Sequence, residues 1–362
     1  MKLKIDNSKT YAIALEGGGA KGAYHIGVWQ ALEEAGIKYN AVSGTSVGAL
    51  NGAMMCMRDL QKAADIWKSI RFSDVINLDE DAEEDFIRLV KGQAEISEIG
   101  EFLPHFRDII KNRGLDVSPL RSWVREVADC DKIRNSDVEL FITTMSLTDR
   151  KGLEIKINDM DDDEMCDMLL ASAYHPTFRQ EKLGGKNYAD GVFVDSLPIR
   201  VLVENGYKDI IAVSLPGGGM IKPYKIPEDG SLTLIDTKSD LGGVLNFDAE
   251  QSRNNLLIGY MDAKRVLYGL YGERYYIERT LSEREALDLL IEHCYDGEGS
   301  LRKFIERELP VMVIKAGFIH ADYYDVLIAE LEDRAEKQAL EKYEIYSDKQ
   351  LIEMLLSKKQ EV

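Results

Sequence analysis

Short apolar runs alternate with segments of helical spacing through the first 215 residues of the chain. The pattern predicts strands at 11–15, 40–43, 138–145, 153–157 and 209–215, and helices at 23–35, 47–58 and 61–70. A strand–helix–strand order of this kind builds a mostly parallel sheet with helices on its faces. We therefore predict an α/β domain over residues 10–215, with a mostly parallel central sheet flanked by helices and its last strand at 209–215.

Two stretches depart from this alternation. Residues 74–118 contain the acidic run 79–85 followed by a helical pattern, and we interpret them as an insertion or lid over the sheet edge. A stretch rich in Pro, Gly and Asp at 216–230 marks a loop or boundary. Beyond it the pattern is mostly amphipathic, so we predict a mainly helical C-terminal region over 216–362. This region covers the sheet, forms a lid or makes a subunit contact, and the pattern does not choose among these roles.

The segment between the second predicted strand and its helix reads Gly44-Thr45-Ser46-Val47-Gly48. A strand-to-helix turn this tight forces its central residue into a strained backbone conformation, so the flanking positions must lack a bulky Cβ. The same turn holds the serine hydroxyl out of the sheet, at the positive end of the helix dipole. The segment therefore predicts a nucleophile elbow, with Ser46 as nucleophile and Gly44 and Gly48 as the small flanking residues.

The first predicted strand runs directly into a glycine-rich loop, Gly17-Gly18-Gly19-Ala20-Lys21-Gly22. Consecutive glycines free backbone N–H groups to point at an anion, and Lys21 adds a positive charge nearby. The loop also matches the Gly-x-Gly-x-x-Gly pattern of dinucleotide-binding domains, which requires a second strand that ends in an acidic residue. Here that strand ends at Ser46, so an oxyanion hole for acyl transfer is the better interpretation. A dinucleotide-binding module stays the alternative from another class.

A third motif, Asp190-Gly191-Val192, follows a predicted turn and strand. Alone, Asp-Gly is an ordinary turn signal. In chain order, however, the glycine-rich loop, Ser46 and Asp190 resemble the motifs of the patatin-like phospholipase family. The run Ala171–Phe178 is similar to the segment that leads into the Asp-Gly of that family, so the resemblance extends over residues 10–215.

The sequence departs from the family pattern at two positions. Val192 follows the Asp-Gly where the family usually has a glycine or an alanine, and Ser196 stands where an asparagine often precedes the Leu-Pro. Neither change touches the nucleophile or the carboxylate. We expect Val192 to affect how closely the Asp190 strand approaches Ser46.

The resemblance implies a serine acyl hydrolase that cleaves carboxylic esters of lipids, as a phospholipase A or a lipid esterase does. Ser46 and Asp190 would form a catalytic dyad that needs no histidine and passes through an acyl-Ser46 intermediate. The loop Gly17–Gly22, assisted by the N–H of Val47, would form the oxyanion hole, and no cofactor is expected. A free aspartate is a weak base, so we expect burial to raise the Asp190 pKa. A transacylase that uses the same dyad is the first alternative.

Composition bounds the partners and the location of the protein. The chain has 362 residues and a net charge of −19, which disfavours nucleic acid and anionic membrane surfaces as partners. No apolar run approaches the ~18 residues of a membrane span, and residues 1–9 lack the apolar core of a signal peptide. We expect a cytoplasmic protein that acts on a lipid or another acyl ester and is open to transient contact with a membrane surface. The oligomeric state is not readable from the sequence.

The cysteines, the acidic run 159–164 and two of the histidines are interpreted as structural rather than as metal-binding or catalytic. The four cysteines are far apart in the sequence and indicate reduced buried thiols rather than a zinc site or disulfides: Cys56, Cys130, Cys166 and Cys294. An EF-hand loop starting at Asp159 would need a glycine where Glu164 stands, so the acidic run 159–164 predicts a solvated helix start and no metal site. We expect His25 to pack behind the glycine-rich loop and His175 to line the pocket.

Overall fold

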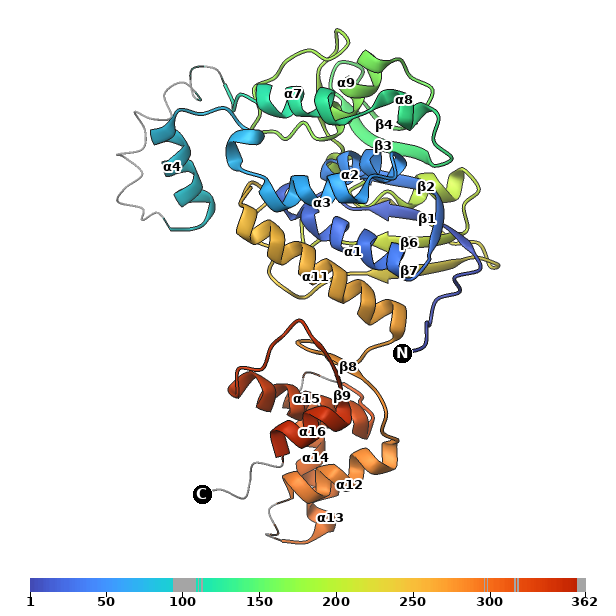
Figure 1. Cartoon of the computed structure of the whole chain (residues 1–362), viewed down its shortest axis with the longest axis vertical. Helices are drawn as coiled ribbons and strands as arrows, with labels where there is room; N and C mark the ends of the chain where they lie inside the picture. The colour runs from blue at the N-terminus through green and yellow to red at the C-terminus, as the bar shows by residue number, and fades with distance from the viewer. Residues whose placement is uncertain are drawn as a thin grey trace. The chain divides into compact units, whose positions relative to one another are not determined.

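The computed structural model describes residues 1–93, 109, 111, 113–295, 297, 299–315, 317 and 319–356. The chain divides into two compact units, one formed by Asp6–Ala263 and the other by Met1–Ile5 together with Lys264–Val362 (Figure 1). Among the described residues, no helix is both long enough and apolar enough to cross a membrane.

The larger unit is built around a sheet of seven strands in the order β4-β3-β2-β1-β6-β7, with β5 paired to β3. The strands are β1 (Thr10–Leu15), β2 (Lys38–Thr45), β3 (Glu139–Ser146), β4 (Lys151–Lys156), β5 (Tyr188–Asp190), β6 (Asp209–Val213) and β7 (Ser231–Ile235). Four of the pairings are parallel, and only β4 and β5 run antiparallel to β3. The prediction of a mostly parallel sheet flanked by helices is therefore confirmed.

Helices cover both faces of this sheet. The helices of the larger unit are α1 (Ala23–Glu34), α2 (Val47–Cys56), α3 (Leu60–Ser69), α4 (Glu80–Val90), α7 (Ser118–Val127), α8 (Cys130–Arg134), α9 (Asp162–Ser172), α10 (Ile199–Glu204) and the greater part of α11 (Ala249–Tyr268). Successive side chains of a strand point to opposite faces. Accordingly, Ala41 of β2 packs in one cluster with Ile199 of α10, while its neighbour Val42 faces Gly52 of α2.

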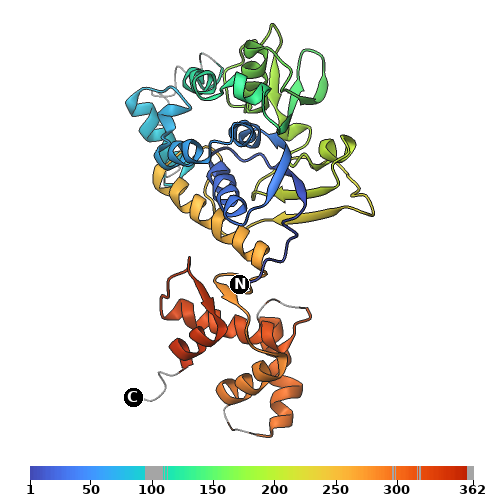
Figure 2. The ribbon, with the colours of Figure 1, turned by 45° about the vertical axis from the view of Figure 1, so that its right-hand side comes forward.

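Helix α11 lies beside α1, although the two are far apart in sequence (Figure 1, Figure 2). The hydroxyl of Tyr24 in α1 donates a hydrogen bond of 3.2 Å to Oδ2 of Asp262 in α11. Both residues are buried, so this contact joins the start of the larger unit to its end.

The sheet does not end at the strand predicted for 209–215. Strand β7 (Ser231–Ile235) pairs in parallel with β6, so the prediction that 209–215 is the last strand is wrong. Strand β7 is a half-exposed edge strand in which polar and apolar residues alternate. It follows a stretch rich in Pro and Gly, so its sequence pattern does not stand out as that of a core strand. The division into domains at 10–215 and 216–362 stays a prediction, whereas the compact units of the structure divide after Ala263.

Both acidic runs begin helices. The Asp79 side chain caps α4 by accepting a 2.9 Å hydrogen bond from the N–H of Ala82, and the Asp161 side chain caps α9 in the same way through Glu164. Carboxylates are favoured at helix N-termini by the free N–H groups and by the helix dipole. Residues 94–108, 110 and 112 lie outside the described residues, so the lid or insertion over 74–118 stays a prediction.

The smaller unit is mainly helical, with a parallel pair of short strands. Its elements are β8 (Tyr276–Glu278), α12 (Glu283–Cys294), α13 (Leu301–Lys303), α14 (Leu309–Lys315), α15 (Tyr323–Lys337), β9 (Ile345–Ser347) and α16 (Asp348–Leu356). A buried carboxylate stabilises its entry loop: Glu332 Oε1 accepts hydrogen bonds from the backbone N–H groups of Glu273, Arg274 and Tyr275. The helical character predicted for this end of the chain is thus present.

Candidate active site

Ser46 occupies the turn between β2 and α2, with φ 57° and ψ −125°. This conformation is strained for a residue with a side chain. The turn is also too tight for side chains at its flanks: a Cβ on Gly44 would lie 2.2 Å from the carbonyl oxygen of Gly48, and one on Gly48 would lie 2.4 Å from that of Leu15. Ser46 therefore stands at the first turn of α2 and lines a pocket, although only 7% of its surface is exposed.

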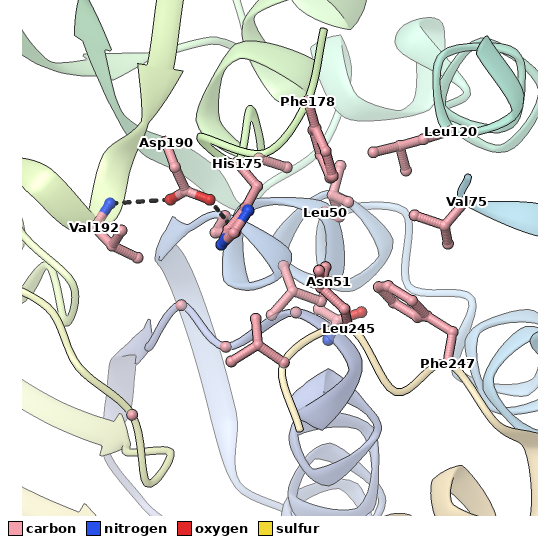
Figure 3. A pocket seen from close by; sticks show the side chains of 18 of the residues that line it. Leu50, Asn51, Val75, Leu120, His175, Phe178, Asp190, Val192, Leu245 and Phe247 are labelled. Carbon is pink, nitrogen blue, oxygen red and sulfur yellow. Dashed lines mark hydrogen bonds between the residues drawn. The ribbon is translucent and has the colours of Figure 1, made fainter. Parts of the chain in front are cut away.

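Asp190 lies at the end of β5, within hydrogen-bond distance of Ser46. The Ser46 hydroxyl donates to Asp190 Oδ2 at 2.8 Å, and Oδ1 accepts from the N–H of Val192 at 3.0 Å (Figure 3). The Asp190 carboxyl is 2% exposed, and this burial raises its pKa from 3.8 to about 6. The carboxylate is therefore a stronger base than a solvated aspartate and is still ionised at neutral pH.

Strand β5 reaches Ser46 because Gly191 has no side chain. A Cβ on Gly191 would lie 2.1 Å from the carbonyl oxygen of Thr143 in β3. Val192 turns its side chain toward the glycine-rich loop, where a Cβ on Gly17 would lie 2.7 Å from its Cγ1. The valine that departs from the family pattern thus packs against the loop, and the hydrogen bond between Ser46 and Asp190 is intact.

A second serine, Ser172 at the end of α9, holds the backbone of the elbow. Its hydroxyl oxygen accepts a 2.9 Å hydrogen bond from the N–H of Ser46 and donates one of 2.7 Å to the carbonyl of Thr143. Ser172 is fully buried. The sequence does not reveal the role of this residue in the run Ala171–Phe178, because an isolated serine at a helix end carries no signal of its distant partner.

The glycine-rich loop keeps two backbone N–H groups free. The N–H of Gly17 donates to the Ser196 carbonyl at 3.0 Å, that of Ala20 to the Val244 carbonyl at 2.8 Å, and that of Lys21 to the Gly18 carbonyl at 3.2 Å. Within the part of the chain that the structure describes, the N–H groups of Gly18 and Gly19 have no acceptor. Both residues line the pocket with Ser46. Of the predicted oxyanion loop Gly17–Gly22, Gly18 and Gly19 are therefore the pocket residues whose N–H groups are available to an oxyanion.

Charged side chains fix the two ends of this loop. The buried carboxylate of Glu16 accepts hydrogen bonds from Ser214 Oγ at 2.6 Å and from the N–H of Leu215 at 2.8 Å, and a longer one from Ser196 Oγ. The ammonium group of Lys21 donates to the carbonyl of Pro216. Lys21 is thus tied to the loop after β6 and does not line the pocket, and Ser196 supports the glycine-rich loop through both its carbonyl and its hydroxyl.

The pocket beside Ser46 has a volume of about 150 Å³ and is mostly apolar. Its apolar walls include Leu50, Val75, Leu120, Phe178, Leu245 and Phe247 (Figure 3). Leu245 and Phe247 come from the loop before α11, in the region that the sequence analysis separated from the catalytic domain. Their contribution depends on tertiary contact, and nothing in their local pattern reveals it.

The two histidines near the site differ in their surroundings. His25 is buried outside the pocket, with Nδ1 at 3.3 Å from Nδ2 of Asn51, and burial lowers its pKa to about 3. His175 lines the pocket, as expected. Neither ring has a hydrogen bond to Ser46 or Asp190 among the described residues.

A family model described as Patatin-like phospholipase matches residues 13–203. The chain belongs to the patatin-like phospholipase family. Two relatives match over short segments: patatin-like phospholipase domain-containing protein 6 of Mus musculus is 49% identical over 51 residues, 14% of this chain and 4% of that protein. Neuropathy target esterase sws of Drosophila melanogaster is 54% identical over 44 residues, 12% of this chain and 3% of that protein. The chain thus matches only a small fraction of the length of these relatives.

Two solved structures are similar at low sequence identity. VipD from Legionella pneumophila has 12% identity and a TM-score of 0.41, over 91% of this chain and 85% of that one. The type III effector protein ExoU has 16% identity and a TM-score of 0.37, over 90% of this chain and 69% of that one. Membership in the patatin-like phospholipase family, which rests on residues 13–203, favours acyl transfer over dinucleotide binding as the use of the glycine-rich loop.

Proposed function

We propose that this protein is a serine acyl hydrolase that cleaves carboxylic esters of lipids, of the phospholipase A or lipid esterase type. The observation that carries the proposal is the 2.8 Å hydrogen bond from Ser46 Oγ to Asp190 Oδ2 in the lining of an apolar pocket. A serine that donates to a buried carboxylate has a general base already in place. The membership of the chain in the patatin-like phospholipase family supports the same reaction class.

In the proposed reaction, Ser46 Oγ attacks the ester carbonyl carbon while Asp190 accepts the hydroxyl proton. The tetrahedral intermediate collapses, the bond to the leaving alcohol breaks, and Asp190 returns its proton to the alcohol oxygen. Water then attacks the acyl-Ser46 ester by the same route and releases the fatty acid. A pKa of about 6 suits Asp190 for this role, because the group is ionised at pH 7 yet more basic than a solvated carboxylate.

The N–H groups of Gly18 and Gly19 are the proposed oxyanion donors, with the N–H of Val47 at the start of α2 as a third. Their role follows from their freedom and from their place in the pocket wall with Ser46. Donors of this kind stabilise the charge that develops on the carbonyl oxygen, and removing one costs about 3 to 4 kcal/mol of transition-state stabilisation in known enzymes.

The apolar walls favour an acyl chain as the occupant of the pocket. Each methylene group transferred from water to such a wall contributes about 0.8 kcal/mol. The predominance of apolar side chains such as Leu120 and Phe247 over polar ones in the lining supports a lipid acyl ester rather than a small polar ester.

Labelling with a fluorophosphonate probe tests the proposal. We expect the wild-type protein to be modified at Ser46, and Ser46→Ala to lose both the label and the hydrolysis of a panel of lipid esters. Ser252→Ala is the matched control, because Ser252 is a buried serine that does not line the pocket. A label that persists on another serine of the folded Ser46→Ala protein would overturn the assignment. Product analysis with an acceptor lipid separates hydrolysis, which releases free fatty acid, from transacylation.

A further inference from the structure

The imidazole of His175 is held in one tautomer by a local turn. The backbone N–H of Thr177 lies 3.3 Å from Nδ1 and donates to it. A backbone N–H has no lone pair to offer, so Nδ1 must carry the lone pair and Nε2 must carry the proton. The Thr177 hydroxyl lies 2.8 Å from the same Nδ1, and in this tautomer the hydroxyl is the donor. A further hydrogen bond from the N–H of Phe178 to the His175 carbonyl closes the turn.

The same surroundings keep this ring neutral. His175 is half-buried and its ring packs on Phe178, with ring centroids 5.7 Å apart. Burial lowers the pKa of His175 from its ordinary value. A proton on Nδ1 would also break the contact with the backbone N–H of Thr177, which can only donate. At neutral pH, His175 is therefore an uncharged side chain with an N–H donor at Nε2.

Most other polar side chains of the pocket already have partners. Ser46 and Asp190 bond to each other. The Asn51 amide donates to the Gly22 carbonyl and accepts from the indole N–H of Trp67. Asp74 accepts from the N–H of Arg71. Within the described residues, His175 Nε2 has no hydrogen-bond partner, so it is an N–H donor available to a ligand in the pocket.

This donor lies on the Asp190 side of the pocket. The backbone carbonyl of Tyr174, next to His175, accepts a 2.9 Å hydrogen bond from the N–H of Asp190. In the view of Figure 3, His175 and Asp190 lie on one side of the pocket, and the apolar side chains of Leu120, Val75 and Phe247 lie on the other. An ester with its carbonyl at Ser46 and its acyl chain among those apolar side chains directs its leaving group toward His175.

We infer that His175 Nε2–H binds an oxygen of the leaving group, namely a glycerol hydroxyl or a phosphodiester oxygen. This inference rests on the proposed function. It makes His175 a specificity residue that favours esters of oxygen-bearing alcohols over esters of simple alkyl alcohols. The contact involves no reacting atom, so it contributes to substrate binding rather than to the chemical step.

Three esters with the same acyl chain test the inference: the monodecanoyl esters of glycerol and of glycerophosphocholine, and ethyl decanoate. His175→Phe keeps an aromatic ring but removes the donor, while His175→Gln places an amide N–H near the position of Nε2. For His175→Phe, we expect the ratio of kcat/KM for an oxygen-bearing ester to that for ethyl decanoate to fall about tenfold, mainly through KM. We expect His175→Gln to restore most of this ratio.

The outcomes distinguish a glycerol hydroxyl from a phosphodiester oxygen as the group bound by His175. They also distinguish a failure of the inference about His175 from a failure of the proposed function. A fall confined to the glycerol ester identifies a hydroxyl, and a fall confined to the glycerophosphocholine ester identifies a phosphodiester oxygen. An unchanged ratio in His175→Phe, with Ser46-dependent turnover intact, would overturn the role of His175 alone. An absence of Ser46-dependent turnover of all three esters would overturn the proposed function and this inference together.

The tautomer gives an independent readout that does not require substrate. A two-bond ¹H–¹⁵N spectrum of the histidine-labelled protein at pH 7 should show the His175 proton on Nε2 and the lone pair on Nδ1. A proton on Nδ1, or a doubly protonated ring, would contradict the inference.

Discussion

Ser46 Oγ lies 2.8 Å from Asp190 Oδ2, and the two residues are held there by separate parts of the sheet. Ser46 follows β2, and its backbone N–H is fixed by Ser172. Asp190 ends β5, and its second carboxylate oxygen is fixed by the N–H of Val192. The proposed nucleophile and base are thus positioned before any substrate arrives, which would lower the entropic cost of reaching the reactive geometry.

The raised pKa of Asp190 predicts the acid limb of the pH profile. Below about pH 6 the carboxyl is protonated in the folded protein and cannot accept the serine proton. We expect kcat/KM for an uncharged short-chain ester to fall about tenfold for each pH unit below 6 and to be flat above pH 7. Circular dichroism at each pH checks that the fold persists. A profile that stays flat down to pH 4.5 would show that Asp190 does not act as the base.

The same burial predicts that Asp190→Asn stabilises the protein. A shift from 3.8 to about 6 means that folding disfavours the charged carboxyl by about 3 kcal/mol. Because the folded-state pKa is raised, wild-type stability is greater below the unfolded pKa and declines as the pH rises through 6. We expect Asp190→Asn to exceed the wild type by about 1 to 3 kcal/mol at pH 8, and the gap to close toward pH 4.5. Urea unfolding at both pH values measures this, and a destabilised variant at pH 8 would refute it.

Gly18→Ala probes the proposed oxyanion donors. A Cβ at Gly18 would lie 2.6 Å from Cδ1 of Leu215, so either the Leu215 side chain turns away or the loop shifts and tilts its N–H groups. We expect kcat to fall about 10²- to 10³-fold with little change in KM, because the loop acts on the transition state. Gly218→Ala is the matched control: Gly218 also lines the pocket, but its Cβ would have no neighbour within 4 Å. A Gly18→Ala enzyme that changes only in KM would indicate a loop that binds substrate.

Ser172→Ala probes the support of the elbow. The variant leaves the N–H of Ser46 and the carbonyl of Thr143 without their shared partner in the core. We expect a loss of about 1 to 3 kcal/mol in the free energy of unfolding and a fall of about tenfold or more in kcat from the misplaced nucleophile. Ser252→Ala serves as control, because Ser252 is equally buried and its hydroxyl has no hydrogen-bond partner in the described part of the chain. Equal effects of the two variants would exclude a special role for Ser172.

The sequence predicts those parts of the site whose backbone conformation is set by neighbouring residues in the chain. The glycines around Ser46 indicate a turn that only small residues permit. The Asp190-Gly191 pair by itself indicates only a turn, and the close approach of β5 to β3 at Gly191 is seen in the structure. The mostly parallel sheet follows from short apolar runs joined by helices, whereas the order of its strands is known only from the structure.

The features that the sequence does not reveal depend on contacts between distant segments. Which glycine-loop N–H groups remain free is decided by the carbonyls of Ser196 and Val244. Part of the pocket wall comes from Leu245 and Phe247, and strand β7 joins the sheet by pairing with β6. These partners carry no pattern that links them to the site, so tertiary structure is needed to find them.

We propose that Ser46 and Asp190 act as one catalytic unit, and a double-mutant cycle measures this coupling. The measurement is kcat/KM for one ester in the wild type, Ser46→Ala, Asp190→Asn and the double variant, all verified as folded. Each single change should cost at least about 10³-fold, and the double variant should be no more than about twofold slower than Ser46→Ala alone, because a base without its nucleophile has nothing to activate. Losses that multiply in the double variant, or an Asp190→Asn enzyme close to wild type, would contradict the account.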